Sequence, residues 1–210
     1  MKWLSKKIEN IKLNRGYIIK DDFFPQNLAE QLRKFALDGN IPYDRSYPNG
    51  YFSREFDNES THSMPDYASN IIKEIAKDFV APSLALLEER KYIRSWSFTY
   101  HSRCPGVLPH ADPSFLNINV WVTPNNAIED RSKNGLILYR KKAPKDWTWR
   151  EYNQDRRKIK DFLKGVKYDR IPYKFNRAVI FPGNTFHATD SVHTNPGDEN
   201  RRVNYTFLYA

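Results

Sequence analysis

Leu116-Asn117-Ile118-Asn119-Val120-Trp121-Val122 is the stretch that points most directly to the fold, because aliphatic residues occupy every second position along it. Successive side chains of an extended strand point to opposite faces, so this alternation predicts a β-strand with one apolar face. The other face carries Asn119 and Trp121. Two interpretations of that face stay open: it is exposed to solvent, or it lines the mouth of an active site.

The same period of two continues on both sides of this strand. Further strands are expected at residues 93–100, 135–139, 177–181 and 202–209, and a short one begins at Tyr17. Apolar residues at helical spacing predict helices over 26–38 and from about Pro65, and a helical insertion over 144–164. Residues 40–62 are expected to form a loop, whose aromatic part (43–56) is either a lid or ordinary surface.

Helices therefore come first and antiparallel strands follow. That order predicts an α+β fold with a β-sandwich or barrel at its centre. The 210 residues, 40% of them hydrophobic, suit one domain with a full-sized core. We expect a helical support over residues 1–90 and a strand core over 91–210.

Charge and cysteine content narrow the class of protein. The net charge of +9 indicates either a solvated basic surface or attraction to an anionic partner or substrate. Cys104 is the only cysteine, so no internal disulfide marks an oxidising compartment. The N-terminus lacks the apolar run of a signal peptide, and no stretch approaches the ~20 apolar residues of a membrane span. These features predict a cytoplasmic protein without a membrane partner.

His110-Ala111-Asp112 is the strongest candidate for chemistry, since residues i and i+2 of an extended chain face the same side. A second imidazole from an adjacent strand would complete a set of two histidines and one carboxylate, which leaves open positions on iron(II). His187 follows the expected strand 177–181 and a turn, so it is the expected third ligand. His193 is either a surface residue or a rival ligand. The alternative for His110 and Asp112 alone is a turn histidine with a capping aspartate.

The last expected strand adds a second group of polar residues. Arg202 opens it, and Thr206 lies two strand repeats further on the same face. A guanidinium with a nearby hydroxyl is a good cradle for a buried carboxylate. The phenol of Tyr100, ten residues before His110, could donate to the same ligand. Because Arg201 would face the opposite side, a register shift of one would exchange the two arginines.

Together these residues resemble the 2-oxoglutarate/iron(II) oxygenases, in particular their prolyl-hydroxylase-like and phytanoyl-hydroxylase-like branches, over nearly the whole chain. The resemblance implies a double-stranded β-helix with iron(II) held by His110, Asp112 and His187. It assigns the distal carboxylate of 2-oxoglutarate to Arg202, with Thr206 four residues on and Tyr100 ahead of the His-x-Asp motif. Asn134-Gly135 replaces the two glycines of many members, which is a mild departure because Asn tolerates turn geometry.

The activity implied by the resemblance is a dioxygenase reaction. Oxidative decarboxylation of 2-oxoglutarate would be coupled to hydroxylation of a small molecule or a peptide side chain, with ascorbate as reductant. The basic net charge leaves an anionic substrate open. Two alternatives remain. One is a cupin-like metal-binding protein without 2-oxoglutarate, which Arg202 and Thr206 speak against. The other is a nucleic-acid demethylase on the same scaffold, although no nucleic-acid motif is present.

Overall fold

A large antiparallel sheet organises the molecule. The computed structural model describes residues 16–57, 66–83 and 90–210. In these ranges seven strands form one sheet in the order β1-β9-β6-β12-β4-β3-β2. Its strands are β1 (Ile18–Lys20), β2 (Arg45–Tyr47), β3 (Tyr51–Asp57), β4 (Tyr92–Tyr100), β6 (Leu116–Trp121), β9 (Ala178–Pro182) and β12 (Arg202–Tyr209). Neighbouring strands of this sheet are antiparallel, and β12 lies in the middle.

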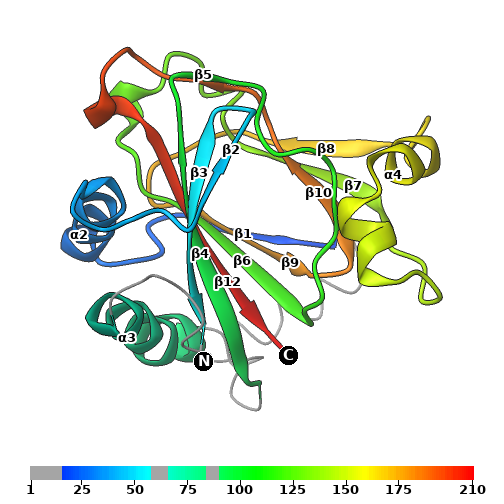
Figure 1. The fold of residues 1–210 in the computed structure, drawn as a ribbon, viewed down its shortest axis with the longest axis horizontal. Helices are drawn as coiled ribbons and strands as arrows, with labels where there is room; N and C mark the ends of the chain where they lie inside the picture. The colour runs from blue at the N-terminus through cyan, green and yellow to red at the C-terminus, as the bar shows by residue number, and fades with distance from the viewer. Residues whose placement is uncertain (1–15, 58–65, 84–89) are drawn as a thin grey trace.

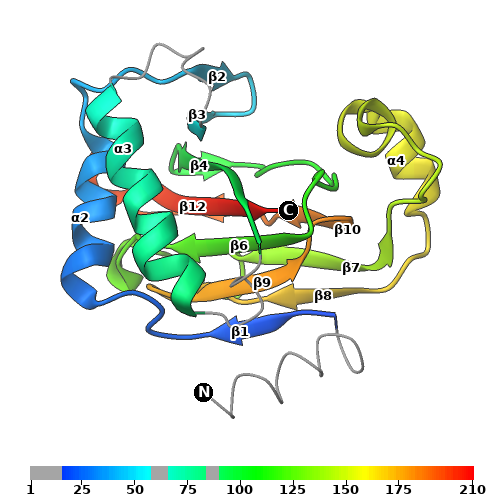
Figure 2. The same ribbon diagram turned by 90° about the horizontal axis from the view of Figure 1, so that it is seen from below.

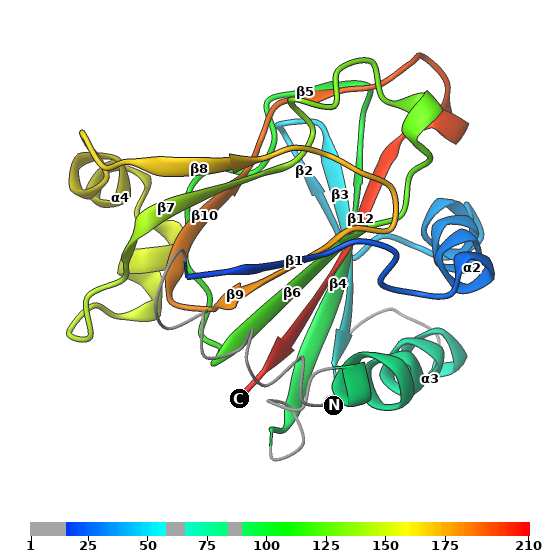
Figure 3. The same cartoon turned by 180° about the vertical axis from the view of Figure 1, so that it is seen from behind.

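Smaller sheets close the other side of the barrel. One has the order β10-β7-β8, and the other pairs β11 with β5. Their strands are β5 (Arg103–Cys104), β7 (Leu136–Lys142), β8 (Tyr168–Ile171), β10 (Thr185–Thr189) and β11 (Val192–His193). Figures 1 and 3 show β10, β7 and β8 on one side of the large sheet and the helices α2 and α3 on the other. This two-sheet arrangement is the expected double-stranded β-helix.

The helices cover the outer face of the large sheet, as Figure 2 shows for α2 and α3. The helical segments are α2 (Gln26–Leu37), α3 (Asp66–Ile75) with a π-helical turn (Ala76–Val80) and a 3₁₀ turn (Ala81–Ser83), 3₁₀ turns at Asn125–Ala127 and Asp198–Asn200, a π-helical turn at Arg150–Gln154, and α4 (Arg156–Phe162). The last two lie in the expected insertion, at the far end of the barrel from α2. None of the helices in the described ranges combines the length and apolar character needed to cross a bilayer.

Strand β12 shows why the sheet has two different faces. Val203, Tyr205, Phe207 and Tyr209 belong to the core shared with α2 and α3. The hydroxyl of Tyr205 donates to Leu32 O of α2 at 2.8 Å. The alternate residues, which include Arg202 and Thr206, point into the barrel. Both faces of β12 are therefore buried, and polar side chains are enclosed on the inner one.

Part of the N-terminal region differs from the sequence-based expectation. Residues 40–62 were expected to form a loop, but β2 and β3 form a hairpin within them, and β3 pairs along its whole length with β4. The aromatic segment 43–56 is therefore mostly an edge of the large sheet and not a separate lid. Tyrosines and phenylalanines lie there among Pro, Asn and Gly residues, and this mixture suggested a loop. Aromatic residues nevertheless have a high propensity for strands. Within the described part of the first 90 residues, the strands β1, β2 and β3 therefore accompany the helices.

The Asn134-Gly135 turn has the geometry expected of it. Asn134 adopts a φ of 63°, a left-handed conformation that asparagine tolerates better than most residues. Gly135 has no room for a side chain, because a Cβ there would lie 1.8 Å from Ile171 O of β8. Glycine at this position allows β7 to begin directly against β8.

The buried guanidinium of Arg54 joins the hairpin to α2. It donates to five backbone carbonyls, those of Phe35, Ala36 and Asp38 at the end of α2 and those of Ile41 and Pro42 beyond it. Carbonyls at a helix C-terminus have no partner within the helix, so this side chain satisfies them. Burial lowers the pKa of Arg54, but the carbonyl oxygens complement its charge.

We predict that Arg54→Ala lowers the free energy of unfolding by about 3 kcal/mol, because several buried carbonyls would lose their donor. Chemical denaturation measures this change. Arg103→Ala is the control, since Arg103 is exposed and pairs at the surface with Glu129, and it should change the stability by less than about 1 kcal/mol. Equal effects of the two substitutions would contradict the role of Arg54.

Candidate metal centre

Three side chains from distant parts of the sequence converge at one end of the barrel. His110 and Asp112 lie in the segment before β6, and His187 lies on β10. One potential ligand atom from each lies within 4.8 Å of the other two. The backbones of His110 and His187 form a two-way bridge, with N–H to O distances of 2.9 and 2.8 Å. The structure therefore brings together the three residues expected from the sequence.

Both imidazoles are oriented by main-chain carbonyls. His110 Nδ1 lies 2.8 Å from Leu108 O, and His187 Nδ1 lies 3.0 Å from Thr185 O. A carbonyl only accepts, so each Nδ1 donates a hydrogen to it and the Nε2 atom of each ring faces the third ligand. The two Nε2 atoms lie 3.8 and 3.4 Å from the oxygens of Asp112. This is a set of donors suited to a divalent transition metal.

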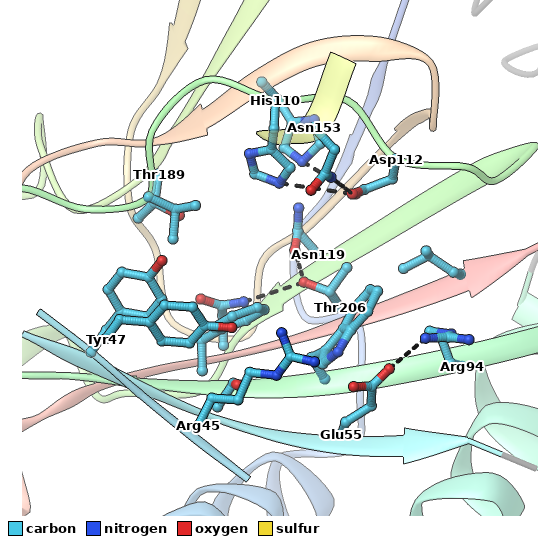
Figure 4. Close-up of a pocket in the computed structure, with 18 of the residues that line it drawn as sticks. Arg45, Tyr47, Glu55, Arg94, His110, Asp112, Asn119, Asn153, Thr189 and Thr206 are labelled. Carbon is cyan, nitrogen blue, oxygen red and sulfur yellow. Dashed lines mark hydrogen bonds and ion pairs between the residues drawn. The ribbon is translucent and has the colours of Figure 1, made fainter. Parts of the chain in front are cut away.

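Two asparagine amides hold the carboxylate of Asp112. Asn117 Nδ2 of β6 donates to Asp112 Oδ2 at 2.6 Å. Asn153 Nδ2 lies 2.9 Å from Ala111 O and 3.5 Å from Asp112 Oδ1. Figure 4 shows Asn153 beside His110 and Asp112 at one end of the pocket. Sequence reasoning did not find either role: Asn117 was visible only as a polar position on an alternating strand, and nothing marked Asn153 within the insertion.

The environment of His187 favours a neutral ring. Burial, followed by the neighbouring charge of His110, lowers the pKa of His187 to about 4. The ring packs edge-on against Phe181 with 4.8 Å between centroids. A neutral imidazole is the form that binds metals, so the site is ready to bind a cation at neutral pH.

A second polar group lies deeper in the barrel, on the inner face of β12. Arg202 Nη1 donates to Asn204 Oδ1 at 2.7 Å, Asn204 Nδ2 lies 3.4 Å from Thr206 Oγ1, and Thr206 bonds to Asn119 of β6. Arg202 Nε also donates to Asn134 O at 2.7 Å. Asn204 was missed, although it lies on the face that the sequence assigned to Arg202 and Thr206.

The charge of Arg202 has only neutral partners among the described residues. Its side chain is 1% exposed and lies 4.7 Å from the ring of Tyr100, with Trp121 and Tyr173 further away. Arg54, which is also fully buried, donates to five carbonyls, whereas Arg202 donates to one carbonyl and one amide oxygen. A buried cation with so few acceptors is well placed to receive an anionic ligand.

The strand register distinguishes the two adjacent arginines. Arg202 faces the barrel, while Arg201 lies outside it and pairs with Asp198 at 2.6 Å. His193, the possible rival ligand, lies outside the metal cluster, where its Nδ1 is 2.9 Å from Arg103 Nη1. Burial raises the pKa of Tyr100, whose hydroxyl lies 3.3 Å from that of Thr189.

A cavity of about 580 Å³ connects the metal cluster to the surface. Tyr100, Asn119, Thr189, Asn204 and Thr206 line it beside His110, Asp112 and His187. Arg202 lies behind Asn204 and Thr206, and is not itself part of the lining. Trp121 is also deeper, stacked on Tyr173 with 5.3 Å between centroids, so Asn119 is the residue of β6 that faces the cavity. The volume is within the range of small-molecule sites.

Comparisons with known proteins identify the fold. No protein-family model matches the chain, and no curated protein sequence matches it. Solved structures do. An oxidoreductase of the 2OG-Fe(II) oxygenase family from Burkholderia pseudomallei matches 99% of this chain and 89% of its own, with a TM-score of 0.65 and 10% identity. HygX from Streptomyces hygroscopicus, solved with nickel and 2-oxoglutarate, matches 98% and 86%, with a TM-score of 0.63 and 10% identity.

A third similar structure is a prolyl hydroxylase from Trichoplax adhaerens in complex with a peptide of hypoxia-inducible factor. It covers 99% of this chain and 89% of its own, with a TM-score of 0.60 and 13% identity. The fold predicted from the sequence, a double-stranded β-helix as in the 2-oxoglutarate/iron(II) oxygenases, is confirmed by these matches.

We predict that the metal-free protein loses stability as the pH falls from about 6.5 to about 4. The folded-state pKa of His187 is about 4 and an unfolded histidine titrates near 6.5, so in this window the unfolded chain binds a proton that the folded chain does not. The stability is fully present above pH 6.5, and the loss approaches about 3 kcal/mol at pH 4. Urea denaturation at several pH values should show this slope and should show a smaller one in His187→Gln. Identical slopes would contradict the low pKa.

Proposed function

We propose that this chain is an iron(II)- and 2-oxoglutarate-dependent oxygenase that hydroxylates a small molecule or a peptide side chain. The observation that carries the proposal is the pairing of two sites along one barrel. A cluster of two imidazoles and one carboxylate lies at the mouth, and a buried guanidinium without a carboxylate partner in the described chain lies below it. Two solved structures of similar fold support the same assignment: HygX, which has nickel and 2-oxoglutarate bound, and the prolyl hydroxylase from Trichoplax adhaerens.

The residues present fit iron(II). His110 and His187 would bind it through Nε2, and Asp112 through a carboxylate oxygen. Three protein ligands on one side of an ion leave positions free for other ligands, as in non-haem iron oxygenases. Asn117 and Asn153 would keep the carboxylate oriented, which is the usual role of groups that contact metal ligands.

The inner polar group fits a dicarboxylate. Arg202 would hold the distal carboxylate of 2-oxoglutarate, with Thr206 and Tyr100 donating hydroxyl hydrogen bonds. Asn204 and Asn119, which bond to this group, would adjust their amides to the ligand. When bound, iron(II) with 2-oxoglutarate supplies activation of dioxygen coupled to decarboxylation of the keto acid to succinate.

The protein contributes orientation and exclusion of water. Leu136 and Leu138 of β7, with Val179 and Phe181 of β9, form an apolar core inside the barrel. This core would exclude water from around the bound cosubstrate, and a low local dielectric strengthens the hydrogen bonds and ion pairs formed there. His110 is the most exposed of the three ligands, so substrate would approach from its side of the cluster.

Succinate formation is the direct test. The purified protein, given iron(II), ascorbate and 2-oxoglutarate in air, should release succinate, and Asp112→Ala should abolish this release because one ligand is lost. Full turnover by Asp112→Ala would exclude the proposed centre. Metal binding without any succinate release would favour the cupin-like alternative. Release stimulated by methylated oligonucleotides would favour a demethylase.

Asn117→Ala should weaken iron(II) binding by about 10- to 100-fold, because the carboxylate of Asp112 would lose the amide that orients it. Metal titration followed by calorimetry measures the affinity. Asn125→Ala is a matched control, since Asn125 lies outside the cavity in a 3₁₀ turn and bonds to Phe175 N. The role assigned to Asn117 is wrong if both variants bind iron(II) as the wild type does.

Arg202→Ala should raise the KM for 2-oxoglutarate by about 10- to 100-fold, the effect of losing charged hydrogen bonds to a carboxylate. Arg201→Ala removes the same charge one position earlier and should leave the KM unchanged. Arg202→Lys should recover part of the affinity, because it keeps the charge and loses the fork. Circular dichroism verifies folding. An increased KM in Arg201→Ala alone would assign the cosubstrate to the other face of β12.

A further inference from the structure

We propose that Arg45 and Arg156 form a subsite at the mouth of the cavity for a phosphate or carboxylate group of the substrate. This inference rests on the proposed function, because it takes the cavity above the metal cluster to be the place where substrate binds. It adds the chemical class of that substrate, a small organic anion. The two arginines come from opposite walls, Arg45 from β2 and Arg156 from the start of α4.

Arg45 is an exposed cation without an acidic partner in the described chain. It lines the cavity, and Figure 4 shows it on the same side as Glu55 and Arg94, opposite the metal cluster. Glu55 is paired with Arg94 at 2.6 Å. The nearby carboxylate is therefore already engaged by the second arginine of this wall, and the guanidinium of Arg45 remains available.

Arg156 lies on the other wall. Among the described residues, its one hydrogen bond runs from Nη1 to Pro109 O at 3.3 Å, a long contact that uses one of five N–H groups. Arg156 lines the same cavity as Tyr51 of β3, although it belongs to the insertion. The hairpin and the insertion thus present a cation from each side.

The balance of charge around the mouth favours an anion. Among the described residues, the acidic ones that line the cavity are Glu55, which is paired, and Asp112, which belongs to the metal cluster. The insertion and its flanking strands add to the positive potential, since residues 140–170 contain twelve lysines and arginines against five aspartates and glutamates. A concave site with walls of one sign concentrates ligands of the opposite sign.

Aromatic side chains in the lining of the same cavity indicate what kind of group carries the anion. Tyr47 and Tyr51 stack with 4.2 Å between centroids, and Trp96 and Trp149 also line the cavity. Trp149 is 48% exposed, although a large aromatic ring is normally buried. Such walls suit a planar or sugar ring that enters toward the metal while its charged group stays at the rim.

The experiment compares three probes with one planar body: 1-naphthyl phosphate, 1-naphthoate and the neutral 1-naphthamide. Calorimetry is done on full-length protein in the presence of EDTA, so that no probe can bind through a metal. We expect the anions to bind more tightly than the amide. Arg45→Ala and Arg156→Ala should each weaken the anions by about 5- to 10-fold and change the amide by less than about twofold. Whichever anion loses more identifies the head group.

Arg157→Ala is the matched control, because Arg157 is the exposed neighbour of Arg156 and does not line the cavity. It removes the same charge and should leave all three affinities unchanged. The subsite is overturned if Arg157→Ala weakens the anions as much as Arg156→Ala, or if only Arg202→Ala affects them. It is also overturned if the anions and the amide bind equally, or if none of them binds.

The succinate assay separates this inference from the function on which it rests. Anion binding that depends on Arg45 and Arg156, in a protein that releases no succinate, would leave the subsite standing and remove the oxygenase assignment. Succinate release by wild type and by both arginine variants, with no preference for the anionic probes, would support the oxygenase assignment and overturn the subsite.

Discussion

Burial of both faces of one central strand is the constraint on which the rest of the structure depends. Strand β12 packs Tyr205 and Phe207 against the helices and encloses Arg202 and Thr206 on its other side. Because side chains alternate along a strand, neither set can move without the other. The apolar set secures the register against α2, and the register then determines which polar groups enter the barrel. The stability of the outer core and the composition of the site are thus two results of one alignment.

The metal cluster depends on a second alignment, between the segment before β6 and strand β10. The reciprocal backbone bonds of His110 and His187 set the two imidazoles side by side, with 4.3 Å between ring centroids. Gly106 permits this segment to approach, since a Cβ there would lie 2.3 Å from Thr189 O of β10. Main-chain geometry, rather than side-chain flexibility, therefore defines the spacing of the candidate ligands.

Much of the fold and the cluster could be predicted from the sequence, because both depend on short periodic patterns. The alternation in 93–100 and 116–122 indicated strands, and the spacing of His110 and Asp112 indicated a common direction. The β2–β3 hairpin was missed, since β2 is only three residues long and both strands lie among turn residues. β8 and β10 were missed for a similar reason, each being only a few residues long.

The remaining site residues could not be predicted because their partners are distant in sequence. Asn153 lies 41 residues beyond Asp112, on an insertion whose composition predicted only a charged, partly helical segment. Arg45 and Arg156 are about half the chain apart in sequence and line the same cavity. Local periodicity does not indicate which wall of a barrel an insertion will contact. Contacts between an insertion and distant segments can therefore be identified only from the three-dimensional structure.

The attachment of the insertion has a consequence for engineering and for divergence. Ala111 N bonds to Tyr152 O at 3.0 Å, and Asn153 bonds to Ala111 O, so the insertion is tied by main chain and side chain to the residue between His110 and Asp112. A segment held in this way is not an interchangeable module. Replacing the segment between β7 and β8 by an unrelated one would leave the backbone N–H and C=O of Ala111 without these two partners. Any homologue that alters this segment must therefore supply new partners for them.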